Sequence, residues 1–216
     1  MEYFLSIVVP VYNEENRIKK TLEKIVDYFS NKKIKYEIIL VNDGSTDNTG
    51  EIINEFKDKL DNNESNCTIS IIDNKRNTGK GFSVRSGVLT SKGKYILFSD
   101  ADLSTPIEEV EHLLFYLKDS FNIAIGSRSL KESKIIIRQN KVRESMGKFF
   151  NFLVRKITSL KYIDTQCGFK IFDRKAIDSI FPYLKIDDFS FDVEILYLAE
   201  KFGLKVKEVP IHWLNS

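Results

Sequence analysis

Apolar residues recur along this chain in short unbroken runs, and stretches with helical spacing separate the runs. A strand with one solvated face alternates apolar and polar residues, whereas a strand buried on both faces is continuously apolar. The pattern therefore predicts an α/β fold, with a mostly parallel, Rossmann-like central sheet and helices on both of its faces. The runs are "LSIVVPVY", "YEIILVND", "TISIID", "KYILFSDAD" and "NIAIGS".

Helices are expected between and after these runs. Residues 14–30 carry apolar side chains three and four positions apart, and Pro106 suits the first turn of a helix. Ser45, Thr46 and Asp47 are favoured N-cap residues, which places another helix directly after them. Further helices are expected at 174–181 and 191–202, with a last strand in "KVKEVPIHW".

No repeat, low-complexity segment or linker divides the 216 residues, so a single domain spanning 1–216 is expected. Hydrophobic residues make up 42% and charged residues 30%, a balance typical of folded chains. The net charge of +2 points to no particular partner. Cys67 and Cys167 are too far apart for a metal knuckle and fit a reducing compartment. Neither a signal peptide nor a membrane-spanning segment is expected.

Polar clusters follow the ends of four predicted strands. In an open parallel sheet, ligands bind beyond the carboxyl ends of the strands. We therefore expect these clusters to meet in one cleft. The clusters occupy residues 10–14, 42–47, 77–81 and 100–104.

Asp100 and Asp102 lie one residue apart where an apolar run stops. Two carboxylates held close together repel each other unless a cation or several donors neutralise them. Mg²⁺ and Mn²⁺ prefer oxygen ligands and often bridge a carboxylate to phosphate oxygens, so the pair predicts a metal site. The alternative is a solvated turn in which Asp100 caps the helix after Pro106.

The stretch "NTGKG" at residues 77–81 is similar to a phosphate-binding turn, with Lys80 and glycine amides at a helix start. It is not a Walker A loop, because Asn74 stands where the first glycine should be. No G-x-G-x-x-G follows a strand, which argues against a dinucleotide-dependent dehydrogenase. Beside an acidic, metal-type pair, this turn favours a diphosphate ligand.

Residues 131–162 form a basic segment, with nine Lys or Arg against two Glu. An amphipathic basic helix can lie in a membrane interface, where anionic headgroups attract each Lys or Arg by about 1 kcal/mol. The competing interpretation packs the apolar stripe of this helix into the core and leaves its lysines solvated. The stripe consists of Val142, Met146, Phe149, Phe150, Leu153 and Ile157.

Six short motifs follow one another along the chain: "IVVPVYNEE", "VNDGSTD", "RNTGKG", "SDADLSTP", "GSR" and "DTQCGFK". Their order and spacing resemble those of family 2 glycosyltransferases of the GT-A fold, over essentially the whole chain. Within that family the chain looks most like the dolichyl- and polyprenyl-phosphate sugar synthases, and "DTQCGFKIF" with "FDVEIL" resembles the glucosyltransferase branch. The resemblance implies a nucleotide-sugar-binding half at 1–128 and an acceptor-binding half at 129–216.

The resemblance also implies a nucleoside site after the first two predicted strands. Asp43 would accept a hydrogen bond from the base, and Val41 would lie nearby. The nucleoside would be cradled by Pro10, Tyr12 and Glu14.

For the ribose and diphosphate, the resemblance implies contacts with Asp100 and Ala101. Asp102 would hold the divalent ion, Mg²⁺ or Mn²⁺, with Asp100 as a second ligand. Asn77 and Lys80, in the expected phosphate-binding turn, complete the predicted donor site.

Acceptor and catalytic residues are implied in the second half of the chain. Arg128 matches a basic residue that faces phosphate in the related synthases, and it is both a catalytic and an acceptor-binding candidate. Asp192 lies where relatives place an acidic residue near the acceptor; it is a candidate base for a hydroxyl acceptor, or it only caps its helix. The other candidate anion contacts are Arg138, Arg143 and Lys170.

The resemblance predicts an inverting transferase that moves glucose from UDP-glucose to dolichyl or polyprenyl phosphate. It would be peripheral at the cytoplasmic face of a membrane, with no nucleic-acid partner. A phosphate acceptor, with a second pKa near ~6, is mostly a dianion and needs positioning more than deprotonation.

Three alternatives stay open. A GDP-mannose-dependent synthase is less favoured, because Ser104 stands where some mannosyl relatives carry glutamine. A family 2 transferase with a hydroxyl acceptor would need a carboxylate base. A non-catalytic nucleotide-sugar-binding protein would be free to lose Asp100 and Asp102, which are both present.

Overall fold

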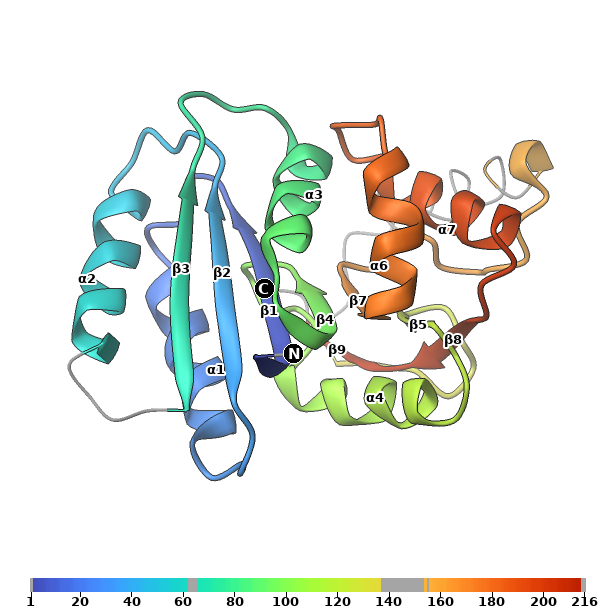
Figure 1. Ribbon diagram of the computed structural model, residues 1–216, viewed down its shortest axis with the longest axis horizontal. Coiled ribbons are helices and arrows are strands. Elements are labelled where there is room, and N and C mark those ends of the chain that lie inside the picture. Colours follow the sequence, from blue (N-terminus) through green and yellow to red (C-terminus); the bar gives the residue numbers. More distant parts are fainter. Residues whose placement is uncertain (1, 62–65, 137–153, 155, 215–216) are drawn as a thin grey trace.

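A seven-stranded sheet forms the centre of the protein (Figure 1). The structure is a computed structural model that describes residues 2–61, 66–136, 154 and 156–214. Four parallel strands make up one half of the sheet, in the order β3-β2-β1-β4. These are β1 (Tyr3–Val11), β2 (Tyr36–Asn42), β3 (Cys67–Asp73) and β4 (Gly93–Ser99).

The other half of the sheet is mixed. Strand β7 (Phe169–Asp173) runs antiparallel between β4 and β5 (Ile123–Ser127), and β8 (Val206–Pro210) pairs in parallel with β5. The sequence did not predict β7 as a strand, because Lys170 interrupts its apolar run. Lys170 is nevertheless buried, because Asp192 of a later helix pairs with its ammonium group.

The predicted last strand divides in two. β8 belongs to the central sheet, whereas β9 (His212–Trp213) pairs with β6 (Lys134–Ile135) in a separate two-stranded sheet. The division at Ile211 carries β9 toward the carboxyl end of β4, where Leu214 donates its N–H to Ser104. The break therefore brings a segment far along the chain to the loop that follows β4.

Helices cover both faces of the sheet, as predicted (Figure 1). One face carries α1 (Ile18–Ser30), α2 (Thr49–Asp61) and α4 (Val110–Lys118), the last preceded by the 3₁₀ turn η1 (Ile107–Glu109). The other face carries α3 (Lys80–Thr90), α6 (Arg174–Ile180) with the 3₁₀ turn η2 (Phe181–Tyr183), and α7 (Phe191–Lys201).

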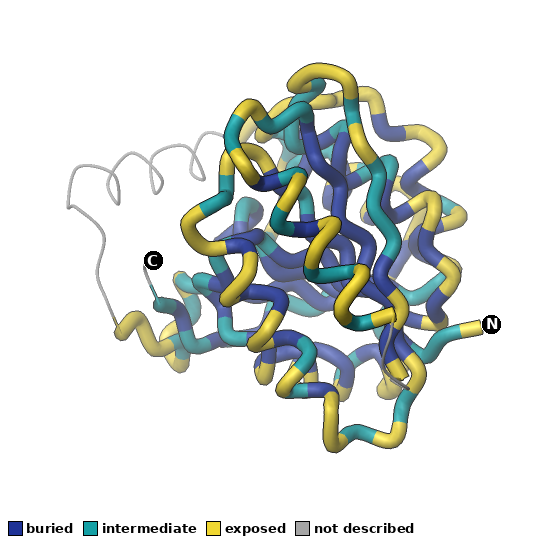
Figure 2. The backbone as a smooth tube through the Cα atoms, turned by 90° about the vertical axis from the view of Figure 1, so that its left-hand side faces the viewer, coloured by how far each residue is buried: buried dark blue, intermediate teal, exposed yellow. Residues whose placement is uncertain are grey.

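Burial on both faces explains why the strands are continuously apolar. On β1, Ile7 packs into the core with α1, and Val8 packs into the core with α3. Buried residues accordingly fill the central strands and exposed residues lie on the outer helical surfaces (Figure 2). The expected fold class, a mostly parallel sheet between helical layers, is confirmed.

The first helix begins later than the spacing predicted. α1 starts at Ile18, because Asn13 adopts a left-handed backbone conformation with φ 55° and residues up to Arg17 form a turn. In the next loop, Asp47 accepts a hydrogen bond from the Thr49 amide, and the residue directly before α2 is Asn48, one position after the predicted N-cap candidates. The loop with Asn13 follows β1, and the loop with Asp47 follows β2.

The order of the strands fixes where a ligand can bind. β3 lies at one edge, so the chain must cross β1 to form β4 on its other side. Loops that follow β1 and β4 therefore diverge, which opens a crevice at the carboxyl ends of the strands.

Candidate active site

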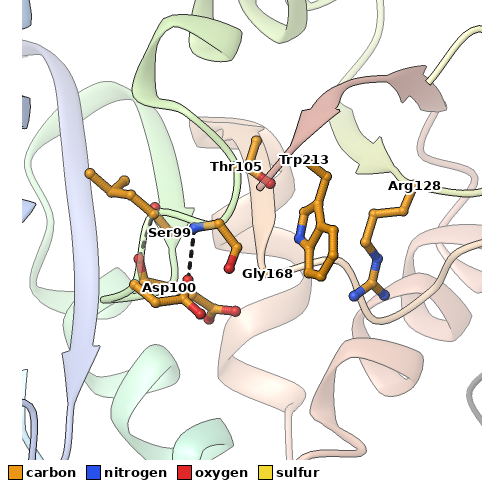
Figure 3. Close-up of a pocket in the computed structure, with 9 residues that line it drawn as sticks. Ser99, Asp100, Thr105, Arg128, Gly168 and Trp213 are labelled. Carbon is orange, nitrogen blue, oxygen red and sulfur yellow. Dashed lines mark hydrogen bonds between the residues drawn. The ribbon is translucent and has the colours of Figure 1, made fainter. Parts of the chain in front are cut away.

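A pocket of about 120 Å³ opens at the carboxyl end of β4 (Figure 3). The loop after β4 forms one wall, and Arg128, directly after β5, lies across from it with the Trp213 ring beside it. The lining residues are Ser99, Asp100, Asp102, Leu103, Ser104, Thr105, Arg128, Gly168 and Trp213. The acidic pair and the candidate basic residue therefore share one cavity.

Asp100 is held against Gly168. The Asp100 amide donates to the Gly168 carbonyl at 3.0 Å, and a Cβ at position 168 would lie 1.9 Å from Asp100 Oδ2. Only glycine at this position leaves room for the carboxylate. The alternative in which Asp100 caps the following helix is wrong, because the residue before η1 is Pro106 and no side chain caps it.

The other carboxylate oxygen of Asp100 faces a cation. Asp100 Oδ1 is buried and lies 2.7 Å from Lys80 Nζ, in an ion pair whose geometry is not that of a hydrogen bond. Among the described residues this oxygen accepts no hydrogen bond. A buried carboxylate oxygen without a donor is suited to bind a cation.

Lys80 stays positively charged in spite of its surroundings. Burial alone would lower the pKa of its ammonium group, but the carboxylates of Asp100, Asp192 and Asp102 raise this pKa above its usual value. Its Nζ also lies 5.4 Å from the centre of the Phe98 ring. The turn before α3 thus delivers a cation to the acidic loop, as the sequence suggested.

The fixed turn after β4 orients Asp102. Its Oδ1 accepts a hydrogen bond from the Ser104 amide at 2.8 Å, while the Ala101 carbonyl accepts from Thr21 Oγ1 at 2.6 Å. In the described part of the chain, no three His, Cys, Asp or Glu side chains are grouped to hold a metal ion. Two carboxylates therefore fit a divalent ion only if a ligand supplies further oxygens.

Arg128 is fixed by a buried carboxylate. Asp164 accepts from the Arg128 Nε and Nη2 atoms at 2.7 Å each, and from its amide at 2.9 Å. Burial would raise the pKa of Asp164, but the Arg128 guanidinium lowers it below the usual value. A guanidinium carries five N–H donors, so those not bound to Asp164 can serve an anion in the pocket.

Asp192 and Lys170 form a buried ion pair. Lys170 Nζ donates to Asp192 Oδ1 at 2.6 Å and to the Cys167 carbonyl at 2.5 Å, and no part of Lys170 is exposed. The expected direct contact between Lys170 and an acceptor anion is therefore wrong in this structure. Burial raises the pKa of Asp192, and Lys170 and Lys80 counteract part of that rise.

The structure also excludes a capping role for Asp192. Ser190 is the residue before α7, and Asp192 lies inside the first helical turn with its carboxylate on Lys170. Between the two interpretations offered by the sequence, the helix cap is thus wrong. Asp192 therefore pairs with Lys170 instead of capping α7, and it stays a candidate functional residue.

Asp43 organises the turn at residues 77–81. Its Oδ1 accepts from the Asn74 side chain, from the Thr78 amide and from Thr78 Oγ1, and its Oδ2 accepts from the Gly79 amide, all at 2.6–2.9 Å. Burial would raise the pKa of Asp43, but these hydrogen bonds lower it. In the same turn, Asn77 Oδ1 accepts from the Gly79 amide.

The remaining donor-site candidates lie at the carboxyl ends of β1 and β2. Pro10 and Val41 are paired across the two strands, and the Val41 side chain is buried in the core. Tyr12 is half-exposed, and Glu14 forms an ion pair with Arg17. Of these residues, Tyr12 and Glu14 carry the side chains that a ligand above the sheet can reach.

Three residues of the site were missed by the sequence reasoning: Asp164, Gly168 and Trp213. The first two lie in the motif "DTQCGFK", of which only Lys170 was predicted to be part of the site. Trp213 carried no signal, because its contact with Arg128 joins β9 to the end of β5. Cys167 is buried, and burial raises the pKa of its thiol to about 12.

Part of the predicted acceptor side lies outside the described residues. This applies to Arg138 and Arg143 and to the stripe residues Val142, Met146, Phe149, Phe150 and Leu153. The last member of the stripe, Ile157, is 80% exposed, so it does not pack into the core. Within the described residues, no helix is long and apolar enough to cross a bilayer.

Comparison with known sequences gives one consistent result. Residues 6–181 match the family model Glycosyl transferase family 2. The dolichyl-phosphate beta-glucosyltransferase of Dictyostelium discoideum is 36% identical over 220 residues, covering 97% of this chain and 66% of the relative. The protein of the same name from Saccharomyces cerevisiae is 37% identical over 226 residues, covering 98% and 67%. The chain spans about two thirds of the length of these relatives.

Solved structures share the fold at low sequence identity. Mannosyltransferase PcManGT from Pyrobaculum calidifontis, in complex with GDP-Man and Mn²⁺, superimposes with a TM-score of 0.65 at 16% identity, over 99% of this chain and 56% of that one. Glucosyl-3-phosphoglycerate synthase from Mycobacterium tuberculosis, in complex with Mn²⁺ and UDP-Glc, superimposes with a TM-score of 0.65 at 16% identity. The match covers 98% of this chain and 70% of that one. The predicted GT-A fold is confirmed.

Proposed function

The chain belongs to glycosyltransferase family 2, and on that premise we propose that it transfers glucose from UDP-glucose to dolichyl or polyprenyl phosphate. The names of its relatives, dolichyl-phosphate beta-glucosyltransferases, support the sugar and the acceptor. Attack from the face opposite the diphosphate would invert the anomeric centre. UDP as the carrier is supported by the resemblance of the motifs.

One observation carries this proposal: Asp100 and Asp102 share a pocket with Arg128. Both substrates are anions, because the donor carries a diphosphate and the acceptor a phosphate. Such substrates approach each other only where cations neutralise them. A site with Lys80 on one side and Arg128 on the other supplies two of these cations.

The acidic pair fits a divalent ion. Asp100 and Asp102 would hold Mg²⁺ or Mn²⁺, which when bound would neutralise charge on the departing diphosphate. Lys80, now paired with Asp100, would lie beside the same diphosphate. Holding the leaving group is the electrostatic contribution that dominates such transfers.

The nucleoside end of the donor would lie above β1 and β2. We propose that Pro10, Tyr12 and Glu14 contact it, with the main chain of Val41 below. Asp43 already accepts four hydrogen bonds, so we propose that it acts on the donor through the 77–81 turn that it holds.

The acceptor end requires positioning more than a base. A phosphate monoester with its second pKa near ~6 is already a nucleophile at neutral pH. Arg128, fixed by Asp164, would bind it, and Asp192, buried against Lys170, would balance charge beneath the site. A hydroxyl acceptor is the second candidate, since burial raises the pKa of Asp192 and so strengthens it as a base.

We further propose that the protein binds a membrane surface peripherally, at the cytoplasmic face. Ile136 and Ile157 are strongly exposed apolar residues at the two ends of the basic segment, and Lys131, Lys156 and Lys161 are exposed near them. Exposed apolar side chains with lysines near them in the sequence suit an anionic interface. Co-sedimentation with anionic but not neutral vesicles would test this binding.

Transfer of radiolabelled sugar tests the proposed reaction. We expect organic-extractable label from UDP-glucose, in the presence of dolichyl phosphate and Mg²⁺, that is lost in Asp102→Asn. Asp119→Asn, which removes an exposed carboxylate after α4, is the matched control and should keep full activity.

Each contrary result has a definite meaning. Label from GDP-mannose alone would move the protein to a mannosyl synthase. If neither donor labels the lipid although the protein still binds UDP, the proposed lipid acceptor is contradicted. Unchanged transfer in Asp102→Asn would contradict the role of the acidic pair.

A further inference from the structure

Three consecutive residues, His212, Trp213 and Leu214, each contact a different part of the site's surroundings. We call residues 212–214 the β9 clasp. Parallel pairing with β6 fixes β9 from its other side. If the clasp shifts, the elements that it contacts are expected to shift with it.

The first contact anchors the clasp on a buried carboxylate. His212 Nδ1 lies 2.5 Å from Glu109 Oε1, and Glu109, at the end of η1, is only 4% exposed. The other carboxylate oxygen of Glu109 lies 2.9 Å from His112 Nδ1. A buried carboxylate needs donors at both oxygens, so Glu109 holds each imidazole firmly.

The second contact reaches Arg128. The Trp213 ring is buried, and its centre lies 5.8 Å from the Arg128 guanidinium carbon (Figure 3). A cation over an indole ring is attracted to it. Asp164 accepts from Nε and Nη2 along one edge of the guanidinium, so Trp213 and Asp164 together determine where the guanidinium points.

The third contact reaches the acidic loop. The Leu214 amide donates to the Ser104 carbonyl at 2.6 Å, and the Ser104 amide donates to Asp102 Oδ1 at 2.8 Å. A shift of the clasp would therefore move the turn that orients Asp102. The two opposite sides of the pocket are tied to the same three residues.

We propose that Glu109 and His212 are positioning residues for the transfer reaction. They fix the β9 clasp, and the clasp sets the distance across the pocket between the Arg128 guanidinium and the Asp102 carboxylate. The contacts described above link Glu109 and His212 to the pocket through Trp213 and Leu214. The activity readout rests on the proposed function, whereas the spectroscopic readout does not.

Trp213 is the single tryptophan of the chain, so its fluorescence reports on the clasp directly. In the full chain, His212→Ala should shift Trp213 emission to longer wavelength and increase its quenching by acrylamide. It should also lower kcat/KM by about tenfold, as loss of an outer partner of a site often does. His212→Asn, which keeps an N–H near the Nδ1 position, should restore most of both.

His112→Ala is the matched control. It removes the same kind of bond to the same carboxylate, but His112 lies on α4 and is not part of the clasp. Emission and kcat/KM should stay at the wild-type values. Equal losses in the two histidine variants would show that Glu109 only stabilises the fold, and would overturn the proposal.

A double-variant cycle tests the route of action. If His212 acts through Arg128, the loss caused by His212→Ala should shrink in an Arg128→Lys background. Full additivity of the two losses, or unchanged Trp213 emission in His212→Ala, would overturn the proposal. Absence of sugar transfer by the wild type would contradict the proposed function alone. Trp213 emission would still show whether His212 fixes the β9 clasp.

Discussion

The two halves of the sheet hold their buried carboxylates in different ways. Beside β2, Asp43 accepts hydrogen bonds from neutral donors of the 77–81 turn and of Asn74. Beside β5 and β7, Asp164 and Asp192 are held by cations, Arg128 and Lys170. The carboxylate beside β2 is thus held by neutral hydrogen bonds, whereas the two beside β5 and β7 are held in charge pairs, as Asp100 at the end of β4 is by Lys80.

This difference suggests a division of tasks. Neutral hydrogen bonds keep one geometry whatever charge a ligand brings, which suits a site that recognises a nucleotide. Charge pairs respond to each added or removed charge, which suits a site where phosphate groups arrive and leave. Four changes would break or sharpen this comparison.

The largest effect is expected from Lys170→Met. It leaves Asp192 buried without its cation, and breaking such a pair costs about 3–5 kcal/mol in the free energy of unfolding. Urea denaturation measures the loss. The double variant Lys170→Met/Asp192→Leu should recover most of this loss. A loss below about 1 kcal/mol in Lys170→Met would contradict the prediction, because it would be no larger than that of a surface ion pair.

Gly168→Ala should act on catalysis. Its Cβ would lie 1.9 Å from Asp100 Oδ2, so the carboxylate must move. Relief of this overlap requires a shift of about 1 Å or more, and a misplacement of about 1 Å in a catalytic site costs about a hundredfold in kcat/KM. Cys167→Ala, at the neighbouring buried position, is the control for stability, and normal transfer by Gly168→Ala would contradict the placement of Asp100.

Asp43→Asn should cost about 1–3 kcal/mol in unfolding free energy, because an amide N–H would face donors that the carboxylate now satisfies. The loss should be the same at low and high salt, since the partners are neutral. Arg128→Gln should instead cost less at high salt, which screens its partly exposed ion pair. Equal salt dependence in both variants would erase the contrast between the two halves.

Acid pH should give the smallest effect. The pKa values of Asp43 and Asp164 lie below the unfolded value of 3.8, so their stabilisation is present above that pH and is lost as pH falls through the folded values. Asp192 has a raised pKa and acts in the opposite direction. Melting temperature should fall below about pH 4. Asp43→Asn should reduce the slope, and an unchanged slope would contradict the role of Asp43.

Much of the first half could be predicted from the sequence. Unbroken apolar runs identify parallel strands, and the loops that follow them must meet at one edge of the sheet, which located Asp100, Asp102 and Lys80. These inferences depend on each segment alone and on the rules of parallel sheets. The start of α1 was misplaced because the turn at Asn13 depends on contacts with the next loop.

The second half depends on pairs that the sequence does not reveal. The sequence predicted that Lys170 contacts an acceptor anion, whereas in the structure its partner is the buried carboxylate of Asp192 on α7, 22 positions later. Asp164 reaches Arg128 from the loop before β7, and Trp213 reaches it from β9, both distant along the chain. Side-chain charge alone does not say which partner a fold brings, so these roles required the structure.

The central claim is that this site is built to position an already ionised phosphate nucleophile. The most direct measurement compares transfer of labelled glucose to dolichyl phosphate and to dolichol, the same lipid without its phosphate, by the wild type and by Asp192→Asn. The account predicts label on dolichyl phosphate only; Asp192→Asn leaves Lys170 without its partner and should lose stability, but its folded fraction should still transfer to dolichyl phosphate. Label on dolichol that is abolished by Asp192→Asn would contradict it and identify Asp192 as the base for a hydroxyl acceptor.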